Sequence, residues 1–163
     1  GHSGWSGPDA DPEAQSDLPA LGVSFEAATA YVEWRSRQDG RAFALPTHEQ
    51  WERAARGGDR RVFPWGDSWE PPYCNGPEGE AGDARPLPVG SRTQDKSPCG
   101  MMDVAGGVHE WVQGAVPHRP DQAWLRGGSW NGHARLARIC SRLAQPRTSR
   151  GGTLGFRLVQ LLS

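Results

Sequence analysis

The chain has 163 residues, the length of one domain, and its formal net charge is −1. Its 18 basic and 19 acidic residues form no run of five like charges, so charge gives no argument for binding nucleic acid or a membrane surface. No apolar stretch is long enough to span a membrane, and 22 Gly, 14 Pro and 8 Trp are typical of a packed, loop-rich fold.

The sequence predicts a single domain. Residues 1–22 are rich in Gly, Pro and Asp without periodicity, so we expect an irregular lead-in or the end of a fragment there. The domain is expected over residues 23–163, and no internal repeat is visible in it.

A first helix is predicted to begin after Ser24, whose hydroxyl can accept a hydrogen bond from an unpaired amide of the first turn. Ala27, Tyr31 and Trp34 recur at helical spacing and predict its apolar face. Gly40 is predicted to end the helix, because glycine adopts the left-handed conformation of a helix C-terminus without strain.

A second helix is predicted to follow closely. Thr47 and Gln50 have the spacing of a capping box, in which each side chain accepts from the other residue's amide. The pair Gly57-Gly58 is predicted to end the helix. Its predicted buried stripe is Trp51, Ala54 and Ala55.

Turn residues dominate residues 62–100, where we expect a strand or two at most. Short strands are predicted within 104–112 and 124–130, around pairs of glycines. The end of the chain alternates and predicts one strand with its core face on the even positions. These positions are Leu154, Phe156 and Leu158.

Local motifs follow one another in a distinctive order. The blocks are 23–28, 41–57, 63–66, 88–91, 100–111, 125–130 and 154–159. The last two begin Leu-Arg-Gly-Gly-Ser-Trp and Leu-Gly-Phe-Arg. Together the blocks resemble the formylglycine-generating-enzyme family, also called the sulfatase-modifying-factor domain, over roughly residues 20–160.

The resemblance implies an α+β fold. This is the C-type lectin fold of the formylglycine-generating-enzyme type, with two short helices, short antiparallel strands and a high loop content. The family's N-terminal strands are not recognisable, so the chain is expected to be a fragment or to pair with a missing piece. A fold of this kind does not by itself imply an activity.

The family's enzymes hold copper through two cysteines just after the Gly-Gly-Ser-Trp block. Gly132 and Ala137 stand at those positions, and Cys140 is the only cysteine nearby. The resemblance therefore implies no copper and no catalytic residue, because copper chemistry of this type needs paired thiolates. A metal-dependent oxidase or a catalytically silent relative stays open as the alternative.

Other metal chemistry has little support among the cysteines and histidines. The cysteines are widely spaced and lack a Cys-x-x-Cys motif, so zinc is not expected, while one disulfide stays possible. The family's iron-dependent branch needs three histidines, but those of this chain show no ligand spacing. They are His2, His48, His109, His118 and His133.

Calcium is the one metal that the resemblance favours, as a structural ion. The carboxylates of Asp103 and Glu110, with the carbonyls of Gly106 and Val108, would form an oxygen cage suited to calcium. The alternative is that Glu110 accepts hydrogen bonds from backbone amides of this glycine-rich loop. Gly107 and His109 stand where the family usually has Asn and Trp.

The segment after Trp130 differs most from the family, which is rich in Asn there. The family's Gly-Gly-Ser-Trp block, its spaced arginines and its Gly-Phe-Arg block are kept, whereas other residue types stand where the family has Asn. Each of these other types can be reached from an Asn codon by changing only adenines. This pattern resembles the variable proteins of diversity-generating retroelements, and it predicts a ligand-binding surface. The predicted positions are Gly132, His133, Leu136, Ile139, Ser141, Leu143, Thr148, Ser149, Gly151, Gly152 and Thr153.

On this hypothesis the apolar members of the segment are exposed contacts for an unknown protein or other macromolecular ligand. No nucleic acid and no membrane insertion are expected. The framework arginines would support the loops by bonding to carbonyls or pairing with carboxylates; they are Arg135, Arg138, Arg142 and Arg150. Alternatively, Leu136, Ile139 and Leu143 form a short buried helical stripe, because their spacing is three and four.

Overall fold

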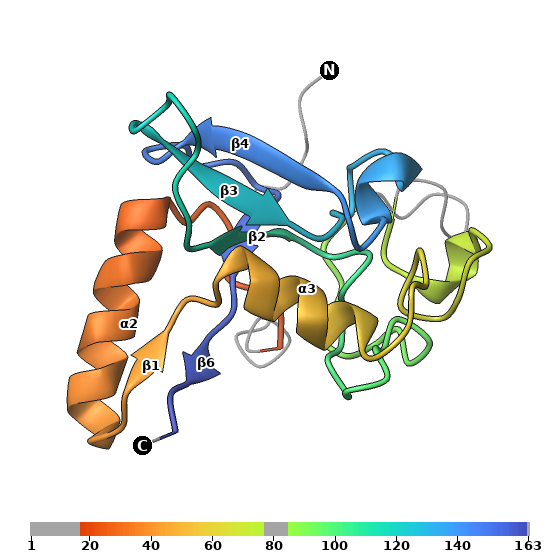
Figure 1. Ribbon diagram of the computed structural model, residues 1–163, viewed down its shortest axis with the longest axis horizontal. Coiled ribbons are helices and arrows are strands. Elements are labelled where there is room, and N and C mark those ends of the chain that lie inside the picture. The colour runs from red at the N-terminus through yellow and green to blue at the C-terminus, as the bar shows by residue number, and fades with distance from the viewer. Residues whose placement is uncertain (1–16, 77–84, 163) are drawn as a thin grey trace, which may run out of the picture.

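A computed structural model describes residues 17–76 and 85–162. Two helices flank a central sheet, and the loops that follow α3 gather at the far end of the sheet from α2 (Figure 1). Within the described residues the chain first forms α2 (Phe25–Asp39), β1 (Phe43–Ala44), α3 (His48–Arg56) and the 3-10 helix η1 (Pro71–Tyr73). The rest are β2 (His109–Val112), β3 (Gln122–Arg126), the 3-10 helix η2 (Ala134–Ala137), β4 (Arg142–Pro146), β5 (Leu154–Phe156) and β6 (Val159–Gln160).

The two helices begin and end as the sequence predicts. Ser24 Oγ accepts from the Ala27 N–H at 3.2 Å, and Gly40 adopts the left-handed conformation with φ of 62°. Thr47 Oγ1 accepts from the Gln50 N–H at 3.2 Å, and Gln50 Oε1 accepts from the Thr47 N–H at 2.8 Å. These caps satisfy amides that a helix leaves unpaired at its first turn.

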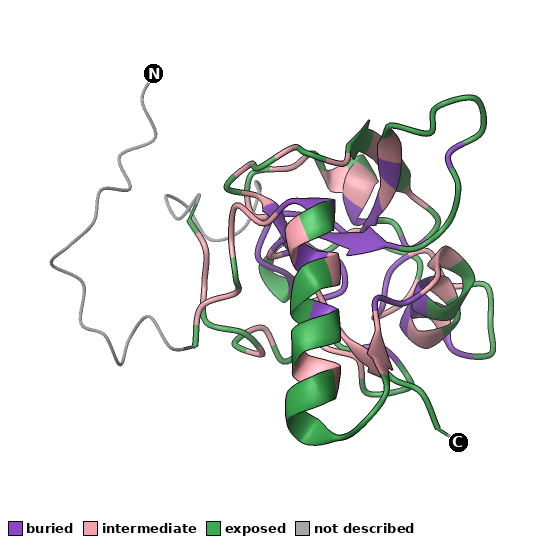
Figure 2. Cartoon of the chain, turned by 90° about the vertical axis from the view of Figure 1, so that its left-hand side faces the viewer, coloured by how far each residue is buried: buried purple, intermediate pink, exposed green. Residues whose placement is uncertain are grey.

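The predicted apolar face of α2 is wrong. The buried residues of the helix are Phe25, Ala28 and Val32, whereas Tyr31 and Trp34 are 40% and 46% exposed. The outward face of α2 is solvent-accessible along most of its length (Figure 2). Tyr31 lies over the edge of the core, with its ring 5.5 Å from that of Phe156, so the large aromatic rings cover the core from outside.

A four-stranded mixed sheet, in the order β4-β3-β2-β5, forms the centre of the fold. Only the β2–β5 pair is parallel, and a separate antiparallel pair joins β1 to β6. The single predicted C-terminal strand is therefore two strands, because the chain leaves one sheet after Phe156 and joins the other at Val159. The even positions do face the core, since Leu154 is buried in it and Phe156 and Leu158 pack against it.

The buried side chains of the described residues form three apolar clusters. The main cluster lies between α2 and the sheet and includes Phe25, Trp111 and Leu125. A second cluster under α3 joins Trp51 to Val104 and Ile139, and a third contains Phe63, Cys74 and Ala137. All three cysteines are free, so the disulfide that the sequence left open does not form.

Asp95 holds the loop that precedes β2. Its carboxylate is fully buried and accepts from the backbone N–H groups of Val104, Ala105 and Gly106 at 2.9–3.0 Å. The sequence predicted strand structure from residue 104, but the chain forms a strand only from His109. The three amides bond to Asp95 instead of to a neighbouring strand.

Asp95 also predicts a pH dependence of stability. Burial raises the pKa of Asp95 to about 7 from the usual 3.8, against the opposing effect of the backbone amides. The unfolded chain releases this proton near pH 3.8 and the folded chain near 7, so the free energy of unfolding should fall as pH rises through this interval. Urea unfolding at pH 5 and pH 8 should show this fall, and Asp95→Asn should flatten it. Equal slopes in both proteins would contradict the assignment.

Candidate functional site

The segment that the sequence singles out as a binding surface, residues 131–153, contains η2, the turn after it, β4 and the return to β5. We call this segment the binding face. Of its predicted contact residues, His133, Thr148 and Gly152 are exposed. The other polar and glycine positions are half-buried, namely Gly132, Ser141, Ser149, Gly151 and Thr153.

The predicted exposure of the apolar residues is wrong for Ile139, whereas Leu136 and Leu143 are partly exposed. Ile139 is 0% exposed and packs with Trp51 and Val112 in the cluster under α3. Leu143 is half-buried against the main cluster, and Leu136 is half-buried. The alternative helical stripe is also wrong, because the three residues lie in η2, in the following turn and in β4. Ile139 is buried rather than exposed because its side chain fills the space between α3 and β2.

Hydrogen bonds from turns hold the binding face in place. Ser141 Oγ donates to the Arg135 carbonyl at 2.7 Å, and the Ser141 N–H donates to the Arg138 carbonyl at 2.9 Å. At the other end, Trp130 Nε1 donates to the Gly152 carbonyl at 3.1 Å. These bonds link the segment after β3 both to β4 and to the approach to β5, so the backbone of the face does not depend on most of its exposed side chains.

The positions of the family's two thiols do not fit copper. Ala137 is buried beside Cys74 in the third apolar cluster, and a Cβ at Gly132 would lie 2.8 Å from Ser129 Oγ. Burial, and then the nearby carboxylate of Asp95, raises the pKa of Cys74 to about 12, so this thiol stays protonated. Cys140 is exposed and supplies only one sulfur.

The four residues predicted to hold calcium do not offer a free oxygen cage. Glu110 Oε2 accepts from Trp51 Nε1 at 2.7 Å and from Arg157 Nε, while Glu110 Oε1 accepts from Arg157 Nη2. Asp103 Oδ2 accepts from the Gly90 N–H at 2.7 Å. A cation placed among these oxygens would also meet the Arg157 guanidinium, which is bonded to both oxygens of Glu110. As arranged, these donors do not suit a cation, and calcium binding stays an untested prediction.

The predicted alternative, in which the Glu110 carboxylate accepts hydrogen bonds from backbone amides, is also wrong, because its partners are side chains. The carboxylate is 4% exposed and pairs with Arg157, which raises the pKa of that guanidinium despite the opposing effect of burial. Arg157 Nη2 also donates to the Met102 carbonyl at 3.0 Å. Glu110 and Arg157 line an open cleft of about 530 Å³ with Met102 and Phe156. This pair therefore ties β2 to the chain between β5 and β6.

The histidines differ in burial and in hydrogen-bond partners. His109 is buried, its Nδ1 lies 2.7 Å from the Gly127 carbonyl, and burial lowers its pKa. His133 is exposed and its Nδ1 accepts from the Arg135 N–H at 3.2 Å. Within residues 17–76 and 85–162, no three His, Cys, Asp or Glu side chains are grouped to hold a metal ion. No helix in these ranges is long and apolar enough to cross a membrane.

The framework arginines of the binding face are exposed, which sequence reasoning missed. Arg135, Arg138 and Arg150 make no side-chain hydrogen bond or ion pair with the described residues, so the predicted supporting role is wrong for them. Arg142 lies over the Trp124 ring, 4.7 Å from its centroid. The sequence held a signal for this surface, because Asp121 is the last acidic residue of the chain.

Comparison with known proteins gives one family. The family model described as "Sulfatase-modifying factor enzyme 1-like domain" matches residues 3–162. Among curated proteins, the mouse "Inactive C-alpha-formylglycine-generating enzyme 2" is 33% identical over 172 residues, covering 93% of this chain and 52% of the relative. The "Formylglycine-generating enzyme" of Streptomyces coelicolor is 31% identical, covering 88% of this chain and 55% of that enzyme. The chain thus spans about half the length of these relatives.

Solved structures have the same fold. PvdO from Pseudomonas aeruginosa superposes with a TM-score of 0.77 at 23% identity, covering 90% of this chain and 63% of that one. Treponema denticola variable protein 1 superposes with a TM-score of 0.75 at 22% identity, covering 96% of this chain and 76% of that one. The predicted α+β, C-type lectin-like fold of the formylglycine-generating-enzyme type is therefore confirmed.

Proposed function

The chain belongs to the sulfatase-modifying factor enzyme 1-like domain family, and on that basis we propose that it is a non-catalytic member that binds a macromolecular ligand through the binding face. The observation that carries the proposal is the filling of both copper positions by residues without sulfur, Gly132 and Ala137. A family relative whose name includes "inactive" supports the view that the fold persists without the activity.

The chemistry around Ala137 supports the loss of catalysis. Its methyl group packs among Phe63, Ala105 and Cys74, where burial would disfavour a thiolate. Cys74 is held protonated and Cys140 stands on the surface, so the two sulfurs have opposite surroundings. A copper ion bound through paired thiolates needs both sulfurs deprotonated and directed at one point.

The binding role rests on the exposure and the backbone bonding of residues 131–153. Exposed side chains such as His133 and Thr148 lie on turns whose hydrogen bonds are made mostly by main-chain groups. Such a surface tolerates exchange of side chains, as the retroelement hypothesis requires. The fold likeness to a protein named as a variable protein agrees with this hypothesis. Ile139 is excluded from the contact set, because it is a core residue.

A thiol-oxidation assay tests the loss of catalysis. The chain, loaded with copper(I) in air, is incubated with a cysteine-containing peptide that the Streptomyces coelicolor enzyme converts. We expect no aldehyde by mass spectrometry and no oxygen uptake above that of free copper, because the paired thiolates are missing. The Streptomyces enzyme is the positive control. Copper-dependent aldehyde formation by this chain would overturn the proposal.

The gene neighbourhood tests diversification separately. If adenine-directed mutagenesis shaped residues 131–153, a nearly identical copy of these codons, rich in Asn codons, is expected beside a reverse transcriptase gene. A complete neighbourhood without both elements would refute the retroelement origin. It would leave the binding role to be judged by binding measurements.

A further inference from the structure

Charge is strongly segregated along this chain. Before residue 122 there are 11 basic and all 19 acidic residues, whereas 7 arginines and no acidic residue follow. The overall charge of −1 therefore conceals a positive C-terminal quarter. Most of this quarter is the binding face and the strands on either side of it.

Three of the seven arginines are compensated by acidic residues from the first part of the chain. Arg126 Nη2 pairs with Glu52 at 2.7 Å, Arg157 pairs with Glu110, and Arg147 lies 3.6 Å from Glu26. The four that remain are Arg135, Arg138, Arg142 and Arg150. All four are exposed, and none has an acidic partner among the described residues.

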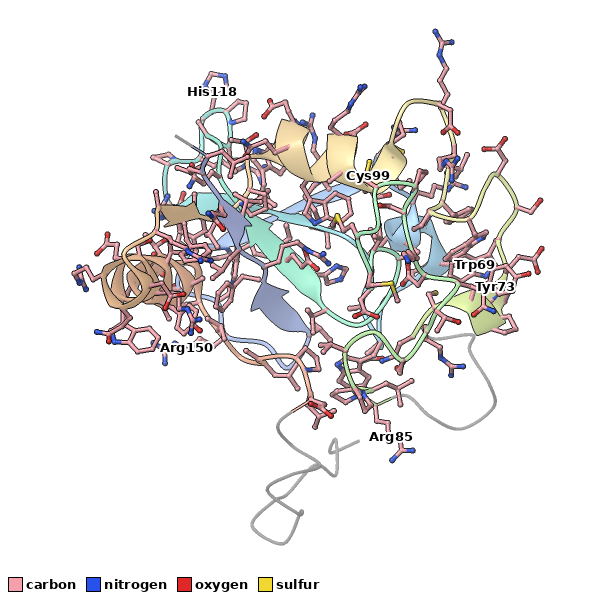
Figure 3. The ribbon with its side chains drawn as sticks, turned by 90° about the horizontal axis from the view of Figure 1, so that it is seen from below. Trp69, Tyr73, Arg85, Cys99, His118 and Arg150 are labelled. Atoms are coloured by element: carbon pink, nitrogen blue, oxygen red, sulfur yellow. The ribbon has the colours of Figure 1, made fainter. Side chains whose placement is uncertain are left out.

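Three of the four lie close together. Ser141 bonds to the carbonyls of both Arg135 and Arg138, and Arg142 is the next residue, at the start of β4. These hydrogen bonds fold the chain from η2 to β4 into one tight turn. We call Arg135, Arg138 and Arg142 the arginine patch. Arg150, which is labelled in Figure 3, lies beyond the other end of β4, on the loop that leads to β5.

The patch suits carboxylates. A guanidinium offers a planar fork of donors that matches a carboxylate with two parallel hydrogen bonds. Arg142 is already oriented by its position over the Trp124 ring, so less side-chain freedom is lost when it binds. Positive charges anchored on one turn without acidic partners gain favourable energy when a ligand brings negative charge to them.

Two further features favour a polypeptide over a nucleic acid. β4 ends the order of the central sheet, and no other described strand pairs with its outer edge, so its main-chain groups can bond to an extended chain. The patch also includes half-buried apolar groups, Leu136 next to Arg135 in η2 and the Trp124 ring beneath Arg142. Arginine and tryptophan are enriched, and lysine depleted, at protein–protein contacts.

We propose that the arginine patch binds an extended, carboxylate-rich protein segment along the outer edge of β4. This inference rests on the proposed function and names the chemistry of its partner. The guanidinium groups pair with the partner's Asp or Glu side chains, and the β4 main chain bonds to its backbone. Attraction should therefore weaken at high salt, while the main-chain bonds fix the direction of the bound segment.

Fluorescence anisotropy can test this with a labelled 12-residue peptide of alternating Glu and Val. The neutral comparison is the same peptide with Gln in place of Glu. We expect the Glu peptide to bind at least about tenfold more tightly, and R135Q/R138Q/R142Q to weaken its binding about tenfold. The control R37Q/R41Q/R150Q removes the same charge from exposed positions on other parts of the surface and should change binding less than about twofold.

Several results would overturn the proposal. They are absence of binding by the Glu peptide, equal binding of the Gln peptide, equal losses in the two triple variants, and tighter binding of a 12-base-pair DNA duplex. Thermal unfolding should show that both triple variants are folded, because all six arginines are exposed. Failure here leaves the non-catalytic assignment standing, since only aldehyde formation in the copper assay would refute that assignment.

Discussion

Replacing Glu110 by alanine is expected to lower the free energy of unfolding by about 3–5 kcal/mol. The substitution leaves the Arg157 guanidinium without its carboxylate and the buried Trp51 indole N–H without an acceptor. Removing one partner of a largely buried ion pair costs more than the pair itself contributes, because the Arg157 charge, whose side chain is 26% exposed, is left with carbonyl acceptors alone. Urea denaturation at pH 7 measures the loss.

Glu26→Ala is the matched control for Glu110→Ala. Glu26 pairs with Arg147 at 3.6 Å, and both side chains are about half exposed, so this loss should stay under about 1 kcal/mol. In the double variant Glu110→Ala/Arg157→Met, part of the stability should return, since no buried charge is left alone. A loss under about 1 kcal/mol for Glu110→Ala would mean that the pair does not hold β2 to the C-terminal strands.

Ile139→Ala is expected to cost about 2–5 kcal/mol, the range for removing a buried aliphatic side chain and leaving a cavity. Ile139→Asn should cost more, because the cluster of Trp51, Val104 and Val112 offers its amide no hydrogen-bond partner. Thr148→Ala should stay within about 0.5 kcal/mol of the parent, because the residue is exposed. His133→Ala should cost about 1 kcal/mol or less, because this exposed side chain makes one hydrogen bond, from the Arg135 N–H at the start of η2. Urea denaturation of the four variants makes the comparison.

The same four variants separate core from contact positions on the binding face. If Ile139→Asn were as stable as His133→Ala, Ile139 would lie at the surface, and the predicted set of variable positions would stand complete. If Thr148→Ala unfolded the chain, the face would depend on its own side chains and could not tolerate exchange. The structure supports neither outcome, because turn hydrogen bonds hold the exposed part and apolar packing holds Ile139.

The sequence was sufficient to predict those features that depend on contacts between residues close together in the chain. The caps at Ser24 and Thr47 and the stop at Gly40 depend on residues within one helical turn, and all were predicted correctly. The ordered motifs were sufficient for the fold, because their order is specific to the family. The rotation of α2 was not predicted, since it depends on Trp111, which is far along the chain and contacts Phe25 with its ring 5.9 Å away.

The candidate site was harder to predict for the same reason. The partners of Glu110 are Trp51 and Arg157, which lie 59 and 47 residues away. No local pattern could show that its carboxylate is already bonded to them. Ile139 is buried only because α3 and β2 converge on it. The exposed arginines could have been predicted from the order of acidic and basic residues along the chain, which total charge conceals.

The pairing of β1 with β6 has a consequence for folding kinetics. Phe43 lies opposite Gln160, so the small sheet joins segments more than a hundred residues apart. Closing so long a loop is entropically costly, and folds with many distant pairings reach the native state slowly. Residues 131–153 lie within this loop but take no part in the pairing of β1 with β6. Substitution of their exposed side chains should therefore leave the refolding rate unchanged, so that the surface can vary without slowing folding.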